Sequence, residues 1–321
     1  MPLTVSRSPE VAAAQARGGA VVALESTLIA HGLPRPRNLE VARDVEEIVR
    51  RHGATPATIA VLDGTVHIGL TDVALERIAG EESLAKLGIR DLPVALATGG
   101  SGATTVASTA LLAARAGIDV FATGGLGGVH RGGGYDESAD LAALAATSIL
   151  VVCAGVKSIL DVAATLERLE SLSVSVLGYR TDAFPGFYLT DSGHPLDWRI
   201  EEPAQAAAVF TARRALQPGA VVVAQPLPVG EQLDPLLHDR VLADALVAAD
   251  ADGIAGKAVT PYLLENLHRV TGGESLRANV RIIERNAELA ARIAVALIDG
   301  AALDGAPIHA VPLDTARPAP S

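Results

Sequence analysis

The chain has 321 residues, of which 49% are hydrophobic and 20% charged, and its formal net charge is −11. This balance excludes a largely disordered chain, and the acidic charge and 3% aromatic content disfavour nonspecific nucleic-acid binding. A chain of this length can bury a large core without disulfides. Charges and glycines interrupt every apolar run before the roughly 18 residues that a membrane span requires, and the first nine residues lack the apolar core of an export signal. We therefore expect a cytoplasmic protein.

Short Val, Ala, Ile and Leu runs alternate with longer amphipathic stretches, which is typical of a layered α/β protein. Several runs are continuously apolar, as expected for strands covered on both faces, and a hairpin-like step at Asp63-Gly64 indicates a mixed sheet. We predict one three-layer α/β/α domain over residues 1–303 and a Pro-rich C-terminal tail over residues 304–321. In chain order, the predicted elements are strand Ala20–Leu24, helix Arg37–His52, strands Thr58–Leu62 and His67–Gly69, helix Thr71–Leu87, strand Val94–Ala97, helix Thr104–Ala116, strand Val120–Ala122, helix Ser138–Ala146, strand Ile149–Cys153, helix Ser158–Leu172, strand Ser175–Gly178, helix Pro203–Leu216, strand Ala220–Ala224, and helices Pro235–Ala249, Pro261–Thr271 and Leu276–Asp299.

Two segments at predicted strand ends in the first third of the chain could carry chemistry, because ligands of open α/β sheets collect at the carboxyl ends of strands. Glu25 directly follows an apolar strand, where a carboxylate is placed for general acid–base catalysis or simply caps a helix or reaches water. The glycine-rich segment Thr98–Val106 could gather backbone N–H groups around a phosphate, or it could form an ordinary tight turn.

The segment from Thr123 to Gly134 contains seven glycines, which predict a flexible loop or a loop that a ligand approaches closely. Its spacing resembles a dinucleotide fingerprint only weakly. Asp136, Glu137 and Asp140 follow and could hold a hard divalent cation with the help of water. Alternatively, Ser138 caps a helix whose positive end favours the nearby carboxylates.

Lys157 follows the most apolar predicted strand, in a chain with three lysines and many arginines. A lysine kept in such a composition suggests a role that arginine cannot fill. Apolar walls and a helix start would disfavour the ammonium form and free the amine to attack a carbonyl; alternatively, the charged end reaches solvent. Cys153, four residues earlier, is expected to pack as a small apolar residue beneath the site.

Together these segments resemble the pseudouridine-5′-phosphate glycosidases, also described as the indigoidine synthase A-like family. The resemblance runs from about residue 10 to about residue 300. The matching segments are Ala23–Thr27 with His31–Pro34, Phe121–Gly132, Ser138–Leu141, Val151–Asp161, Thr181–Tyr188 and Gly256–Pro261.

The resemblance implies a reversible reaction in which pseudouridine 5′-phosphate and water give uracil and ribose 5-phosphate. A two-carboxylate glycosidase mechanism fits poorly, because the leaving atom is carbon and has no lone pair to protonate. In the family, the ribose opens and its C1 forms an imine with a lysine, which Lys157 matches; Glu25 matches the acid–base carboxylate. Asp136 matches the ligand of a Mn²⁺ ion, and the family is expected to form a homotrimer with an α/β/α core.

The resemblance also implies substrate-binding residues. Lys86 matches a lysine that faces phosphate, although Gly88-Ile89 depart from the usual polar pattern beside it. Two further departures lie near the metal ligand: Tyr135 replaces a phenylalanine, and Glu137 replaces an apolar residue, so that it could tighten the metal site or change which group binds the ion. The other matching residues are Val106, Ser138, Ala139, Asp140 and Asn279, the last with Asn286 as a neighbour in the sequence.

The residues by themselves leave other functions open. A Schiff-base aldolase or lyase for a sugar phosphate would use the same lysine, and a binding protein could sense a phosphorylated metabolite without turnover. A dinucleotide-dependent reductase is a third alternative. Release of uracil separates the glycosidase from an aldolase, which produces no free base. A binding protein would tolerate loss of Lys157, and a reductase would bind NAD(P)H.

Overall fold

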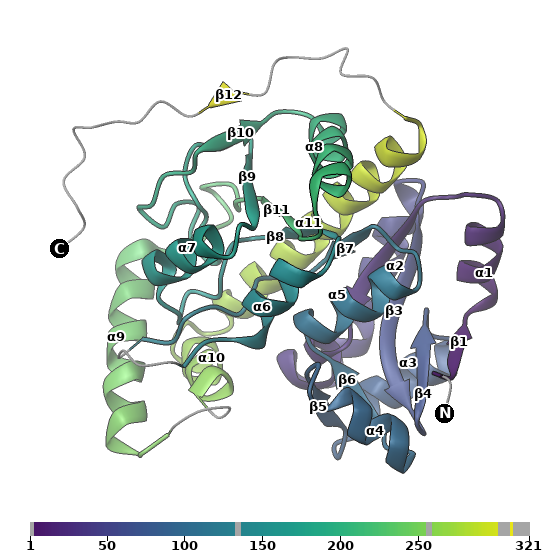
Figure 1. Ribbon diagram of the computed structural model, residues 1–321. Coiled ribbons are helices and arrows are strands. Elements are labelled where there is room, and N and C mark those ends of the chain that lie inside the picture. Colours follow the sequence, from purple (N-terminus) through teal and green to yellow (C-terminus); the bar gives the residue numbers. More distant parts are fainter. Residues whose placement is uncertain (1–2, 132–135, 255–258, 301–308, 311–321) are drawn as a thin grey trace.

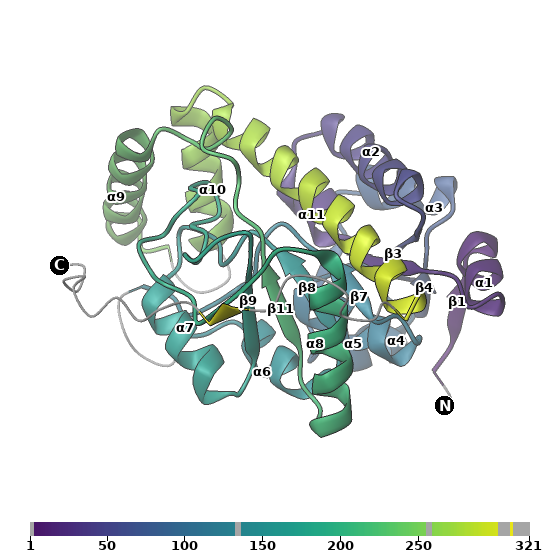
Figure 2. The same ribbon diagram turned by 90° about the horizontal axis from the view of Figure 1, so that it is seen from above.

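The computed structural model describes residues 3–131, 136–254, 259–300 and 309–310. They form a twelve-stranded sheet with helices on both faces (Figures 1 and 2). The strand order is β1-β4-β3-β2-β7-β8-β11-β9-β10-β12, with β6 beside β3 and β5 beside β6. The strands are β1 (Val5–Arg7), β2 (Val21–Glu25), β3 (Thr55–Leu62), β4 (Thr65–Ile68), β5 (Ala85–Leu87), β6 (Gly102–Thr104), β7 (Val120–Ala122), β8 (Leu150–Cys153), β9 (Ser175–Tyr179), β10 (Trp198–Ile200), β11 (Val221–Ala224) and β12 (His309–Ala310).

The sheet is mixed but largely parallel, which confirms the predicted fold class. From β3 through β2, β7, β8, β11 and β9 to β10, every neighbouring pair is parallel, whereas β4 and β6 run antiparallel to β3 and β12 runs antiparallel to β10. The predicted hairpin joins β3 to β4, where Asp63 (φ 50°) and Gly64 (φ 72°) both have the positive φ of a tight hairpin turn.

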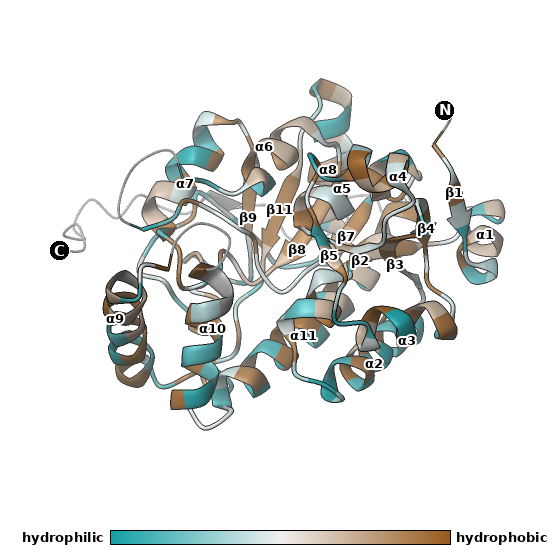
Figure 3. Cartoon of the chain, turned by 90° about the horizontal axis from the view of Figure 1, so that it is seen from below, coloured by the Kyte–Doolittle hydropathy of each residue, from teal (hydrophilic) through white to brown (hydrophobic). Residues whose placement is uncertain are grey.

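Helices cover both faces of this sheet because its central strands are apolar on both sides. One core contains side chains of α1, α4, α5, α6 and α7, and the other contains side chains of α2, α8 and α11. Figure 3 shows hydrophobic strands inside and hydrophilic stretches on α2 and α3. The helices are α1 (Pro9–Ala16), the π-helix η1 (Leu28–Gly32), α2 (Arg37–Arg51), α3 (Asp72–Gly80), α4 (Leu92–Thr98), α5 (Val106–Arg115), α6 (Ala139–Ala146), α7 (Val162–Ser171), α8 (Pro203–Leu216), α9 (Pro235–Ala251), α10 (Val259–Val270) and α11 (Glu274–Ile298).

Three predicted elements are wrong in whole or in part. Val94–Ala97 is predicted as a strand but lies within α4, which begins at Leu92, with Pro93 in its first turn, and is capped by the left-handed Gly99. The helix predicted over Thr71–Leu87 ends at Gly80, and its last residues form β5. The helix predicted from Ser158 begins only at Val162, because the Asp161 carboxylate accepts a hydrogen bond from the Ala164 N–H at 2.9 Å and caps it there.

Within the described ranges, no helix is both long and apolar enough to cross a bilayer. Of the predicted C-terminal tail, only His309 and Ala310 are described, and they pair with β10. Tyr135 and the segment 256–258 of the family resemblance lie outside the described residues.

Candidate active site

Glu25 is held at the carboxyl end of β2 by two threonine hydroxyls. Thr27 Oγ1 donates to one carboxylate oxygen, Oε2, and Thr123 Oγ1 donates to the other, Oε1. Thr123 directly follows β7, the parallel neighbour of β2, so the sheet itself brings the two residues together. Glu25 and Thr123 also line a small cavity of about 20 Å³ with mostly apolar walls. The carboxylate is therefore oriented and partly enclosed, but not sealed from solvent.

Helix α11 reaches this strand end through two asparagines. Asn286, which is 1% exposed, donates from Nδ2 to the Thr123 carbonyl at 2.8 Å. Asn279 lies on the same helix, seven residues earlier in the chain. Its Oδ1 is 3.6 Å from the position that a Cβ on Gly124 would occupy. Asn286 thus fixes the backbone of Thr123, and Asn279 lies beside Gly124.

Lys157 lies beside the same strand ends, in the turn after β8. The segment after β8 pairs with the segment after β7: the Ala154 N–H donates to the Gly124 carbonyl at 2.9 Å, and the Lys157 N–H donates to the Leu126 carbonyl at 3.1 Å. Lys157 is partly buried, and it precedes α7 by a turn rather than standing at the helix start that the sequence predicts. Beneath it, Cys153 is fully buried as predicted, and burial raises the pKa of its thiol to about 12.

Asp140 organises the glycine-rich segment after β7. Its carboxylate, in a residue only 6% exposed, accepts hydrogen bonds from the Ala107 N–H at 2.9 Å and the Gly127 N–H at 2.8 Å. Ser138 caps α6 by accepting from the Asp140 N–H at 3.2 Å, so the predicted cap is confirmed. A Cβ on Gly127 would lie 2.7 Å from the Asp140 carboxylate. This glycine is therefore explained by packing within the protein rather than by a ligand.

The remaining predicted substrate residues lie around this arrangement. Val106 begins α5 and is 2% exposed, whereas Ala139 begins α6 and is exposed. The start of α5 is not an open phosphate cradle, because the N–H groups of Ala107 and Ser108 are bonded to Asp140 and to Thr105. Thr98–Val106 therefore contains a turn, a short strand and a capped helix.

Lys86 lies on β5 with its side chain exposed. It is close to the His31 ring: burial lowers the pKa of His31 first, and the Lys86 charge lowers it further, while a hydrogen bond with the Ala85 backbone opposes both. His31 belongs to η1, which begins three residues after Glu25. Lys86 therefore lies near the segment that carries Glu25. The helix predicted over Thr71–Leu87 did not imply this proximity.

The three carboxylates predicted near the metal site have separate roles. Glu137 forms two hydrogen bonds with Arg168, at 2.7 and 3.0 Å, and this guanidinium lowers the pKa of Glu137. Glu137 is therefore engaged by Arg168, and Asp140 is engaged by backbone N–H groups. Asp136 stays exposed, with its Oδ2 3.9 Å from the His130 Nδ1. Among the described residues, no group of three His, Cys, Asp or Glu side chains is arranged to hold a metal ion.

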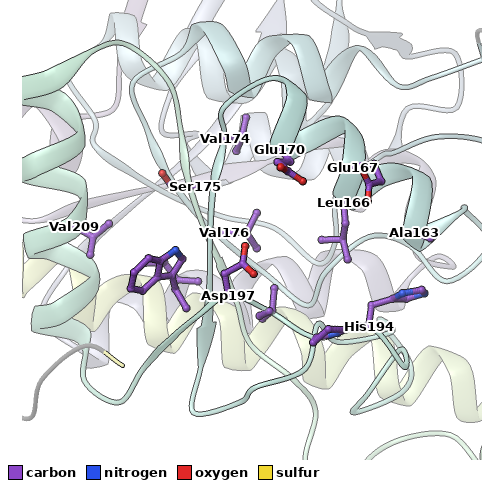
Figure 4. Close-up of a pocket in the computed structure, with 14 residues that line it drawn as sticks. Ala163, Leu166, Glu167, Glu170, Val174, Ser175, Val176, His194, Asp197 and Val209 are labelled. Carbon is purple, nitrogen blue, oxygen red and sulfur yellow. The ribbon is translucent and has the colours of Figure 1, made fainter. Parts of the chain in front are cut away.

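A separate cavity of about 680 Å³ lies between α7, α8 and β9 (Figure 4). Its walls are apolar side chains such as Leu166, Val176 and Val209, with Glu170 and Asp197 among its polar residues. None of the predicted site residues line it. The candidate site is therefore the region at the ends of β2, β7 and β8, where Glu25, Thr123 and Lys157 lie.

Sequence reasoning assigned no role to Thr27, Thr123 or Asn286. The two threonines stand inside the motifs that carry the family resemblance, and Thr123 follows its strand just as Glu25 ends its own. This shared position at the carboxyl end of a strand could have identified Thr123 as a site residue. Asn286 gave no comparable signal, because its partner lies 163 residues away in the sequence.

Comparison with known proteins identifies close relatives. The family described as "Indigoidine synthase A like protein" matches residues 10–296. A pseudouridine-5′-phosphate glycosidase of Frankia alni is 61% identical over 90% of this chain and 81% of its own, and one of Streptomyces griseus is 61% identical over 91% and 92%.

Two solved structures share the fold. The prealnumycin C-glycosynthase AlnA in complex with ribulose 5-phosphate superposes with a TM-score of 0.86 at 39% identity, covering 92% of this chain and 98% of its own. An indigoidine synthase A-like protein of Thermotoga maritima superposes with a TM-score of 0.84 at 35% identity, covering 92% and 97%.

Proposed function

This chain belongs to the indigoidine synthase A-like family and is an enzyme of the pseudouridine-5′-phosphate glycosidase type, and we propose how its residues carry out that reaction. The substrate is pseudouridine 5′-phosphate, and with water it gives uracil and ribose 5-phosphate. The observation that carries the proposal is that Glu25 ends β2 and the Lys157 turn follows β8, the two parallel neighbours of β7, so both lie at the same edge of the sheet.

Lys157 is the proposed nucleophile. Opening of the ribose breaks the bond between C1 and the ring oxygen, and that oxygen takes a proton supplied through Glu25. The uncharged Lys157 amine then bonds to C1 and passes one proton back to Glu25. Breaking the bond from C1 to the uracil carbon leaves a protonated imine between C1 and lysine, while the uracil carbon takes that proton from Glu25. Water hydrolyses the imine and releases ribose 5-phosphate, and the lysine ammonium that results returns a proton to Glu25, which restores both groups.

Substrate contacts follow from the same geometry. The exposed ammonium of Lys86 is proposed to bind the phosphate, and the amide of Asn279 to hydrogen-bond the sugar or base. Because the Asp140 carboxylate is already bonded twice, we propose that Asp140 acts through the backbone that it holds. Val106, Ser138 and Ala139 would likewise contribute backbone groups. The ribulose 5-phosphate bound by AlnA supports a pentose-phosphate site in this fold.

Mn²⁺ is the proposed cofactor, with Asp136 as its protein ligand. The donor set fits a hard ion that keeps most of its water, since Asp136 offers an exposed carboxylate and Glu137 and Asp140 are engaged elsewhere. When bound, the ion supplies positive charge next to substrate oxygens. We also propose a cytoplasmic homotrimer, which light scattering would detect as three times the mass of one chain.

Incubation of the purified protein with pseudouridine 5′-phosphate and Mn²⁺ tests the function, with free uracil and ribose 5-phosphate as the measured products. Borohydride added during turnover should reduce the imine and attach the pentose phosphate to Lys157, which peptide mass spectrometry would detect. Absence of uracil would overturn the function, and uracil release without an adduct on Lys157 would overturn the imine step.

A further inference from the structure

We infer that Thr27 and Thr123 are positioning residues that fix the carboxylate of Glu25 in the orientation needed for proton transfer. This inference rests on the proposed function, because it assigns Glu25 the acid–base role. It extends that proposal by saying what makes Glu25 effective: two hydroxyl donors, one on each carboxylate oxygen.

The Thr27 hydroxyl bonds to Glu25 and does not cap the helix that follows. Thr27 precedes η1 with helical backbone angles (φ −63°, ψ −30°), which differ from the extended angles of a residue whose hydroxyl caps a helix. Here the cap bond is absent, and the hydroxyl donates to Glu25 Oε2 instead. Thr27 is 8% exposed, so the hydroxyl has little access to water. Its hydrogen-bonding capacity is therefore directed at Glu25 rather than at helix stability.

Thr123 is held even more firmly. It is 2% exposed, its N–H donates to the Val152 carbonyl at 3.0 Å, and its own carbonyl accepts from Asn286 Nδ2 at 2.8 Å. Strands β7 and β8 and helix α11 thus all define where its hydroxyl points, and that hydroxyl donates to Glu25 Oε1. A rigid donor of this kind transmits the geometry of the core to the carboxylate.

The two hydroxyls suit a group that changes its protonation state. Each carboxylate oxygen has two lone-pair sites, so one remains available on each oxygen after the threonines have bonded. A threonine hydroxyl can also turn and accept a hydrogen bond when the carboxyl holds a proton. The pair can therefore keep the Glu25 carboxyl in place before and after proton transfer, because only the hydroxyl hydrogen has to turn.

Valine and serine substitutions test this inference. Thr123→Val and Thr27→Val keep the side-chain shape but remove the hydroxyl. Each should lower kcat by about tenfold or more, but by no more than the roughly 10²–10⁴-fold that general acid–base catalysis contributes as a whole. KM should change less than twofold, because the hydroxyls are engaged by Glu25. Thr123→Ser should restore most of the activity. Thr271→Val, which removes another buried hydroxyl bonded to the Leu267 carbonyl at 2.7 Å, should leave kcat unchanged.

The inference is overturned if both valine variants keep the wild-type kcat, or if Thr123→Ser loses as much activity as Thr123→Val. In either case, uracil release by the wild type would still support the proposed function. If the wild type releases no uracil, the proposed function fails first. The inference is then decided by crystal structures of the variants: the Glu25 carboxylate should rotate when either hydroxyl is removed, and an unmoved carboxylate would refute its positioning by the threonines.

Discussion

At the scale of single residues, Lys157 offers the sharpest test of the chemistry. Lys157→Arg keeps a positive charge and a long side chain, but a guanidinium is effectively never deprotonated and cannot bond to C1. We expect turnover to fall on the order of 10³-fold or more, as for removal of a nucleophile. Uracil release measures the loss, and borohydride should attach no pentose phosphate to the variant.

A matched change keeps that test interpretable. Lys86→Arg alters the other described lysine conservatively, and its guanidinium can still pair with phosphate. This variant should keep kcat within about tenfold while changing mainly KM. Turnover of Lys157→Arg at a rate similar to that of Lys86→Arg would remove the amine from the mechanism.

Residue chemistry was predictable where it depended on position along one strand. Glu25 and Lys157 stand out because each follows a continuous apolar run, and parallel strands place such positions at one edge. The role of Asp140 was harder to predict. A carboxylate suggests a bound cation, whereas Asp140 accepts hydrogen bonds from the N–H groups of Ala107 and Gly127. Only the fold brings those donors to it.

At the scale of elements, α2 contains a buried carboxyl that should make stability depend on pH. Glu46 is 7% exposed, accepts from Thr58 Oγ1 at 2.6 Å, and lies 3.3 Å from Arg50 Nη2. Burial is the largest influence and raises the pKa of Glu46, against the opposing effects of Thr58 and Arg50. The folded state therefore binds the Glu46 proton more tightly than the unfolded chain does. Its stabilising contribution is present below the unfolded pKa and is lost as pH rises through the folded pKa.

Glu46→Gln should remove this dependence. As pH rises from about 4 to 7, the free energy of unfolding of the variant should increase relative to that of the wild type, because glutamine has no charge to bury. Arg50 retains two hydrogen bonds to Glu10, both at 2.9 Å, which limits the loss of the ion pair. Urea unfolding at a series of pH values measures the difference. A difference that stays constant over this range would refute the argument.

Element boundaries were predictable where a cap or a long apolar period marks them. Helix α8 matches its predicted range, since Pro203 begins it and its amphipathic pattern continues to Leu216. The run Val94–Ala97 was ambiguous, because four apolar residues fit a strand or one helical turn equally well. Strand β5 has three residues and too short a pattern to show any period, which is why Lys86 was placed in a helix.

At the scale of the whole molecule, the site arises from topology. Residues 25, 123 and 157 are far apart in sequence, but β2, β7 and β8 are adjacent and parallel, so their following segments meet at one edge. Alternation of strands and helices predicts that such an edge exists. It does not predict the strand order, which depends on packing contacts between distant segments. The contact of α11 with Thr123 is one of these contacts between distant segments, so the alternation of strands and helices does not predict it.

The same topology separates the proposed metal ligand from the hydrophobic core, and this gives a last prediction. Asp136 is exposed and lies outside the hydrophobic clusters on both faces of the sheet. Thorough chelation should therefore lower the rate of uracil release on the order of 10²-fold or more, as expected when a catalytic ion is removed. It should leave the midpoint of thermal unfolding unchanged.

Added Mn²⁺ should restore the rate in the wild type but not in Asp136→Asn. Glu137→Gln should respond to Mn²⁺ like the wild type, because Glu137 is paired with Arg168. Rates that survive chelation would remove the metal from the reaction, and a lowered unfolding midpoint would instead assign it a structural role.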